Sequence, residues 1–330
     1  MIRILRTTFL FALTLLIPLT PALLAQTCSS GSDLDAATRT AIDNAATQYL
    51  NMSKNGDVAG LKANAIPAIT GDFSSIEQAV VTNKQYLSQG NATISATYLL
   101  DASDAKAPLA RADFYCGIYN SPDRLSFSIP NLPPGKYAIA IQKVDGKDPI
   151  TLTLILQNMG GAWKLAGYYP RLDAIGGHDG QWYLNQARQY KAKGQSLDAW
   201  FYYLTAWDLT APVNFMSTPQ LDKIADEMQS SRPTNLPSSN APLNLSANGK
   251  VFRVTELTAV PVDNALDLRV VYENPNAGDS GQAFKDNMAM IHAIVAKYPE
   301  VRDAFNSVIA RAVDSSGHQY GSLLPMKEIK

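Results

Sequence analysis

Residues 137–169 read YAIAIQKVDGKDPITLTLILQNMGGAWKLAGYY, and this stretch indicates the fold of the first half of the chain. It holds three runs rich in β-branched and aromatic residues, at 137–141, 150–156 and 162–169. Two sequences rich in Gly, Asp and Asn separate the runs, at 144–148 and 158–161. Such a pattern is typical of strands joined by tight turns. The stretch therefore predicts an antiparallel meander of three strands.

The residues before the meander change from helical to strand periodicity. Ser32 and Asp33 are suitable N-caps for a first helix, and apolar residues recur at helical spacing near 33–52, 57–64 and 74–88. Three alternating segments follow, at 92–99, 111–119 and 124–129. Helices followed by an antiparallel sheet predict an α+β domain, in which N-terminal helices cover one face of a curved antiparallel sheet.

This order of elements, together with the turn at Gly56 and Asp57 and the final strand around Trp163, resembles the nuclear transport factor 2 superfamily. The resemblance covers about residues 33–170. It implies a cystatin-like, cone-shaped α+β domain spanning 26–175. That superfamily includes enzymes and binding proteins alike, so the resemblance implies a fold rather than a function.

Residues 180–213 carry small and aromatic residues at the offsets of a tetratricopeptide repeat. The residues behind this resemblance are Tyr183, Ala187, Tyr190, Gly194, Ala199, Tyr203 and Ala206. The pattern predicts a helical hairpin within a tetratricopeptide-like segment 176–229, with a third helix at 218–229. Because one repeat cannot bury its own apolar face, the hairpin either packs on a neighbouring domain or belongs to a peptide-binding array.

The C-terminal third begins with a stretch rich in Ser, Pro and Asn, 230–247, which predicts a linker. Residues 248–330 are predicted to form a small ββαββ domain. Its helix begins near Asp279 and ends at Pro299, and its strands are expected at 250–260, 266–272, 308–313 and 320–324.

The first 25 residues have the pattern of a cleaved signal peptide. Arg3 and Arg6 precede an apolar run at 9–17, and Ala25 is a small residue suited to the cleavage position. The run is shorter than the roughly 20 apolar residues that a membrane-spanning helix needs. These features predict a periplasmic or secreted protein with no membrane span in its mature chain. An uncleaved N-terminal anchor is the alternative.

The charge balance bears on the partners of the mature chain. Loss of residues 1–25, and with them Arg3 and Arg6, leaves 26 basic residues against 29 acidic ones, a net charge of −3. Nucleic-acid binding requires a concentrated basic face. We therefore expect no nucleic-acid partner.

The chain has two cysteines, Cys28 before the first helix and Cys116 in the segment 111–119. An exported compartment permits a disulfide between them. A disulfide requires Cα atoms within about 7 Å, which the sequence does not determine. A disulfide and a pair of free thiols are therefore both open.

The sequence contains none of several common catalytic and metal-binding motifs. Gly-x-Ser-x-Gly, phosphate-binding loops, Gly-x-Gly-x-x-Gly and cysteine pairs at metal spacing do not occur. His178 and Asp179 are flanked by glycines, but zinc usually takes three or four ligands and no second His or Cys is near in sequence. We expect no metal site and no cofactor.

Asp113 is the candidate for an acid or base, because Asp113, Tyr115 and Tyr119 share one face of the segment 111–119. If that face points into the cone, burial would raise the pKa of Asp113, and Tyr115 and Tyr168 would line a ligand site beside it. If the face points outward, these residues are solvated, as is typical of half-exposed antiparallel sheets.

Aromatic residues gather around Trp200, which predicts either a ligand-binding groove or a domain interface. The function expected from these features is that of an exported, non-enzymatic binding or assembly protein of the cell envelope, with an envelope protein or peptide as partner. A small-ligand-binding or enzymatic cone that uses Asp113 is the alternative.

Overall fold

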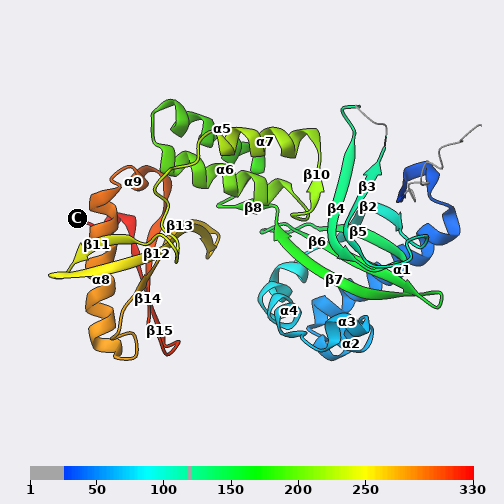
Figure 1. The fold of residues 1–330 in the computed structure, drawn as a ribbon, viewed down its shortest axis with the longest axis horizontal. Coiled ribbons are helices and arrows are strands. Elements are labelled where there is room, and N and C mark those ends of the chain that lie inside the picture. The colour runs from blue at the N-terminus through cyan, green and yellow to red at the C-terminus, as the bar shows by residue number, and fades with distance from the viewer. Residues whose placement is uncertain (1–25, 118–120) are drawn as a thin grey trace, which may run out of the picture.

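A computed structural model describes residues 26–117 and 121–330, and the predicted signal peptide lies outside these residues. The fold is α+β, as predicted. Figure 1 shows an N-terminal unit of helices and sheets at the right, a C-terminal sheet with one long helix at the left, and a helical segment between them at the top. Within 26–117 and 121–330, no helix is long and apolar enough to cross a membrane.

The main sheet of the N-terminal unit contains the predicted meander. Its strands run in the order β1-β2-β5-β6-β7, and all neighbours are antiparallel. Ile139 pairs with Ile155, and Ile155 pairs in turn with Gly167, so the three central runs are in register as hairpins. The strands are β1 (Thr27–Ser30), β2 (Ala92–Asp101), β5 (Lys136–Val144), β6 (Ile150–Met159) and β7 (Ala162–Leu172).

Four helices cover one face of this sheet: α1 (Ala36–Asn55), α2 (Val58–Ala63), α3 (Pro67–Thr70) and α4 (Ser74–Leu87). The N-cap of α1 is Asp35, whose carboxylate accepts from the Thr38 amide, and not Ser32 or Asp33 as predicted. Fully buried side chains fill the space between helices and sheet, among them Ile42, Leu61, Leu87, Ile150, Leu152 and Leu154.

The opposite face of the main sheet is covered by a second sheet of three strands, ordered β10-β4-β3. These strands are β3 (Leu109–Cys116), β4 (Leu125–Leu132) and β10 (Met216–Ser217). The segments 111–119 and 124–129 were expected within one curved sheet, but β3 and β4 form a separate layer. Tyr119, predicted to share a face with Asp113, lies outside the described residues. Phe114 and Phe127 are fully buried between the two layers, which explains why the hairpin folds back.

A disulfide joins the two layers. Cys28 on the edge strand β1 is bonded to Cys116 at the end of β3, and their Cα atoms lie 5.2 Å apart. The bond closes a loop with a sequence separation of 88 residues. It therefore ties the first strand of the described chain to the sheet that covers the main one.

The helical segment contains the predicted hairpin and third helix. After the short strands β8 (Ala174–Ile175) and β9 (His178–Asp179) come α5 (Gly180–Ala192), α6 (Ser196–Thr210) and α7 (Pro219–Gln229). Small residues allow α5 and α6 to approach, since a Cβ atom on Gly180 would lie 2.9 Å from the Ala206 carbonyl oxygen. Ala187, Ala199 and Ala206 are fully buried, as the packing of a close hairpin requires.

The C-terminal unit is a five-stranded sheet, ordered β11-β12-β13-β14-β15, with α8 on one face. Only β13 and β14 are parallel, joined by α8 and the short α9. The elements are β11 (Leu243–Ala247), β12 (Lys250–Val262), β13 (Ala265–Glu273), α8 (Ser280–Lys297), α9 (Val301–Ala304), β14 (Ser307–Val313) and β15 (Gln319–Pro325). The predicted ββαββ order is extended by β11, which lies within the stretch 230–247 that we expected to be a linker.

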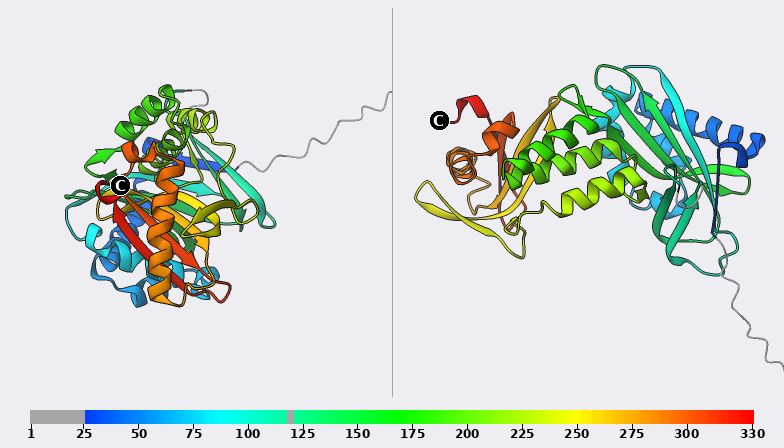
Figure 2. Two further views of the ribbon diagram at one scale, coloured as in Figure 1. Left: turned by 90° about the vertical axis from the view of Figure 1, so that its left-hand side faces the viewer. Right: turned by 90° about the horizontal axis from the view of Figure 1, so that it is seen from above.

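The helical segment and the C-terminal unit share one hydrophobic core. Phe201 and Tyr202 on α6 pack edge-on against Phe305, with ring centroids 6.1 and 6.3 Å apart. The hydroxyls of Tyr190 and Tyr202 donate to the backbone carbonyls of Asp303 and Ala304. The hairpin thus buries its apolar face against a neighbouring unit, and Figure 2 shows it between the two ends of the molecule.

Candidate functional site

Asp113 does not lie in an apolar cavity. It lies on the outer face of the second sheet, where its carboxylate accepts hydrogen bonds from Ser128 and Arg111. The hydrogen bond from Ser128, together with the Arg111 guanidinium, holds the pKa of Asp113 below its usual range. Of the two alternatives for this face of the segment, the structure shows the outward one, because β3 turns its apolar residues inward and Asp113 outward.

The two tyrosines predicted beside Asp113 lie in different surroundings. Tyr115 is 68% exposed on the outer face of β3. Tyr168 is buried on the helix side of the main sheet, and desolvation raises its pKa to about 12. The structure therefore does not bring Tyr115 and Tyr168 together, and apolar side chains occupy the helix–sheet space in which a cone pocket was expected.

Trp200 is half-buried on α6 and belongs to the rim of the shared core. The guanidinium of Arg232 stacks over its ring, 5.6 Å from the centroid. His178 stacks in parallel on Trp182, with centroids 3.8 Å apart. Within residues 26–117 and 121–330, no group of three or more His, Cys, Asp or Glu side chains is placed to hold a metal ion.

The site that best fits a ligand is a cavity of about 530 Å³, which we call the junction cavity. It lies where the N-terminal unit, the helical segment and the C-terminal unit meet. Its walls come from α4, the end of β7, α6 and the turn between β12 and β13. Its size is within the range of about 300–1,000 Å³ that small-molecule sites occupy.

The wall of the junction cavity on the α6 side contains an ion pair. Arg171 on β7 donates to the Asp208 carboxylate at 2.7 Å, and its guanidinium lies 5.7 Å from the centre of the Trp207 ring. Asp208 is 63% exposed while Arg171 is 24% exposed. The pair is therefore a partly neutralised polar group beside an apolar surface, and it can donate and accept hydrogen bonds from one position.

The remaining lining of the junction cavity is largely aromatic and aliphatic. Tyr86 and Tyr169 lie on the N-terminal side, and Leu209 lies on α6. On the C-terminal side, Asp263 and Asn264 both have positive φ and form the two-residue turn of the β12–β13 hairpin. The Asn264 side chain accepts from the Gly176 amide at 2.8 Å, which fixes this turn against the helical segment.

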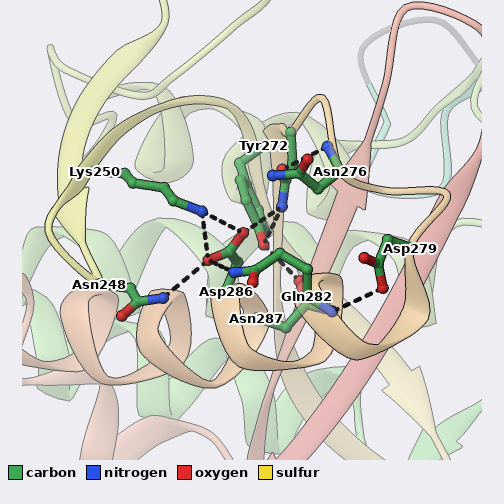
Figure 3. Close-up of polar contacts among 9 residues, drawn as sticks. Asn248, Lys250, Tyr272, Asn276, Asp279, Gln282, Asp286 and Asn287 are labelled. Atoms are coloured by element: carbon green, nitrogen blue, oxygen red, sulfur yellow. Dashed lines mark hydrogen bonds and ion pairs between the residues drawn. The ribbon is translucent and has the colours of Figure 1, made fainter.

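A second polar cluster lies in the C-terminal unit, around the fully buried carboxylate of Asp286 on α8 (Figure 3). Lys250 lies 3.3 Å away, and amide groups supply the other donors, from Asn248, Asn274 and Gln282. Burial would raise the pKa of Asp286, but these hydrogen bonds outweigh it and hold the pKa below its usual range. Asp286 is thus a fixed anion that joins the β11–β12 turn and the β13–α8 loop to α8.

An Asp286→Asn substitution should lower the free energy of unfolding by about 2 kcal/mol, because one acceptor oxygen becomes a donor that faces other donors. Urea denaturation at pH 7 measures the change. Lys250→Gln is the matched comparison and should cost less than 1 kcal/mol, because the Lys250 side chain is 43% exposed. Equal losses in the two variants would contradict a central role for the carboxylate.

No protein-family model, no curated protein and no solved structure matches the chain.

Proposed function

We propose that the protein is an exported binding protein that takes a small, mainly apolar ligand in the junction cavity. The observation that carries this proposal is the composition of the cavity wall. Residues from α4 to the β12–β13 turn converge on one space, although they are far apart in sequence. Aromatic and aliphatic walls with a few converging polar groups are the usual character of small-ligand sites.

The chemistry of the lining suggests the kind of ligand. Tyr86, Tyr169 and Leu209 would contact an apolar or ring-shaped body. Arg171 and Asp208 would bind a group that both donates and accepts hydrogen bonds, such as a hydroxyl or an amide. An anionic ligand is less suited, because Asp208 already neutralises Arg171 and Asp263 also lines the cavity.

The export part of the proposal rests on two features. The pattern of residues 1–25 is that of a signal peptide. The disulfide between Cys28 and Cys116 supports the same compartment, because disulfides persist in the periplasm and outside the cell and are rare in the cytosol. A periplasmic or secreted location is therefore part of the proposed function.

Titration with the neutral fluorescent probe N-phenyl-1-naphthylamine tests the cavity. The wild type should enhance the fluorescence of the probe in a saturable way. Ala259→Trp places an indole in the cavity wall and should weaken the apparent affinity by at least roughly tenfold, the equivalent of about 1.4 kcal/mol. Ala110→Trp, at an exposed position on β3, is the matched control and should leave the titration unchanged.

Two results would overturn the proposal. One is a wild-type protein, folded by its thermal melting curve, that gives no saturable fluorescence. The other is an Ala259→Trp protein that binds the probe as the wild type does, since the probe would then occupy another surface.

A further inference from the structure

A second cavity, of about 650 Å³, is larger than the junction cavity. It lies at the other end of the helical segment, between the α5–α6 turn, the segment 230–236 and the C-terminal end of α8. We call it the basic cavity, because Lys191, Arg232 and Lys297 line it.

None of these three cations makes an ion pair within the described part of the chain. The Lys191 ammonium donates to the Ser230 hydroxyl at 2.7 Å, which is a neutral partner. The Arg232 guanidinium lies over Trp200, and the Lys297 ammonium lies over Tyr298 with 5.4 Å between nitrogen and ring centroid. Cation–π contacts of this kind orient a cation without neutralising it.

The accumulation of positive charge is local. The whole chain has a formal net charge of −1, so three cations without ion pairs around one cavity are not a consequence of a basic composition. Among the described residues, Glu300 is the one acidic residue in the lining. The junction cavity differs in this respect, because its Arg171 is paired with Asp208.

The rest of the lining adds neutral donors and an apolar surface. Ser196 and Thr234 line the cavity, and a serine or threonine hydroxyl can donate to an anion. Leu236, Leu243 and Tyr298 provide the apolar part. A ligand that contacts both the donors and the apolar surface would carry anionic groups on a small organic body.

We propose that the basic cavity binds a small organic anion carrying phosphate or carboxylate groups, with Lys191, Arg232 and Lys297 as its charged contacts. The Arg232 guanidinium suits the planar, two-oxygen face of either group, while the two lysines act as point charges. The contact of Arg232 with Trp200 gives this tryptophan a positioning role in the site. Glu300 would accept from a hydroxyl on the same ligand.

Isothermal titration calorimetry with pyrophosphate and with citrate tests the proposal, in buffer whose ionic strength is matched with sodium chloride. At least one of the two anions should bind the full mature protein at a single site. The one that binds more tightly identifies phosphate or carboxylate as the preferred group. Arg232→Gln and Lys297→Gln should each weaken that binding by roughly tenfold or more.

Lys147→Gln is the matched control, because Lys147 is an exposed lysine in the turn between β5 and β6, away from the basic cavity. It should bind the anion as the wild type does. The proposal is overturned if neither anion gives heat above the chloride blank. It is equally overturned if the Arg232 and Lys297 variants, folded by circular dichroism, keep the wild-type affinity. The neutral probe used for the junction cavity should be unaffected by these variants, so the two proposals fail separately.

Discussion

A Cys28→Ala protein should unfold at a clearly lower denaturant concentration than the wild type, with a free energy of unfolding lower by about 4 kcal/mol. The bond closes a loop with a separation of 88 residues, and in the chain-entropy model a loop of this size is worth about 4–5 kcal/mol. The effect arises because the unfolded chain gains freedom when Cys28 and Cys116 are no longer joined. Guanidinium denaturation under non-reducing conditions measures it.

Reduction provides the control for this prediction. Dithiothreitol should lower the stability of the wild type to that of Cys28→Ala and should have no further effect on the variant. Cys116→Ala should behave in the same way, since each substitution removes the same bond. A wild type whose midpoint does not change on reduction would contradict the stabilising role of the disulfide.

An Asp198→Asn protein should be more stable than the wild type at pH 8, by about 4 kcal/mol. Asp198 in the first turn of α6 is fully buried, and neither carboxylate oxygen has a hydrogen-bond partner among the described residues. Desolvation, with Glu300 and Asp303 nearby, raises its pKa from 3.8 to about 7. A pKa raised by about three units corresponds to about 4 kcal/mol of stability lost when the group is ionised.

The sign of the pH dependence follows from the raised pKa. Between pH 4 and pH 7 the folded protein holds a proton on Asp198 that the unfolded chain has released. The contribution of this group to wild-type stability therefore falls as the pH rises through this window, and it is constant above it. The tyrosines that face Asp198 from the hairpin, Tyr190 and Tyr202, have raised pKa values and stay neutral throughout.

Urea denaturation at pH 5 and pH 8 tests this. The difference in stability between the two pH values should be smaller in Asp198→Asn than in the wild type by about 3 kcal/mol. Asp226→Asn, which changes an exposed carboxyl on α7, is the matched control and should leave the wild-type pH dependence in place. If Asp198→Asn destabilises the protein at pH 8, the carboxylate has partners that the structure does not indicate.

Local patterns predicted most helices and strands, but not how the strands divide into layers. The alternation in 111–119 correctly placed Asp113 and Tyr115 on one face. The packing of β3 and β4 over the main sheet determines which face is solvated. The periodicity within the segment does not indicate this packing. The strand β10 pairs with β4 through only two residues, Met216 and Ser217, so it has no local signal either.

The two cavities could not be predicted from the sequence, for the same reason. The junction cavity takes its walls from segments between Thr82 and Leu266, and none of them forms a motif alone. Trp200 is predicted to lie in a ligand-binding groove or a domain interface, and it lies at the rim of the shared core beside Arg232, which follows it by 32 positions along the chain. The pairing of Cys28 with Cys116 was one of two open alternatives until the Cα distance was known.

The helical segment contacts both the N-terminal unit and the C-terminal unit. It shares its core with the C-terminal unit, while β10 extends the second sheet, and Asp222 on α7 binds Arg124 at 2.7 Å. The N-terminal unit, the helical segment and the C-terminal unit therefore need not unfold as three separate thermodynamic domains. A calorimeter should record one heat-absorption peak for the intact protein, and a protease acting on the native state should find few places at which a single cut releases a compact fragment.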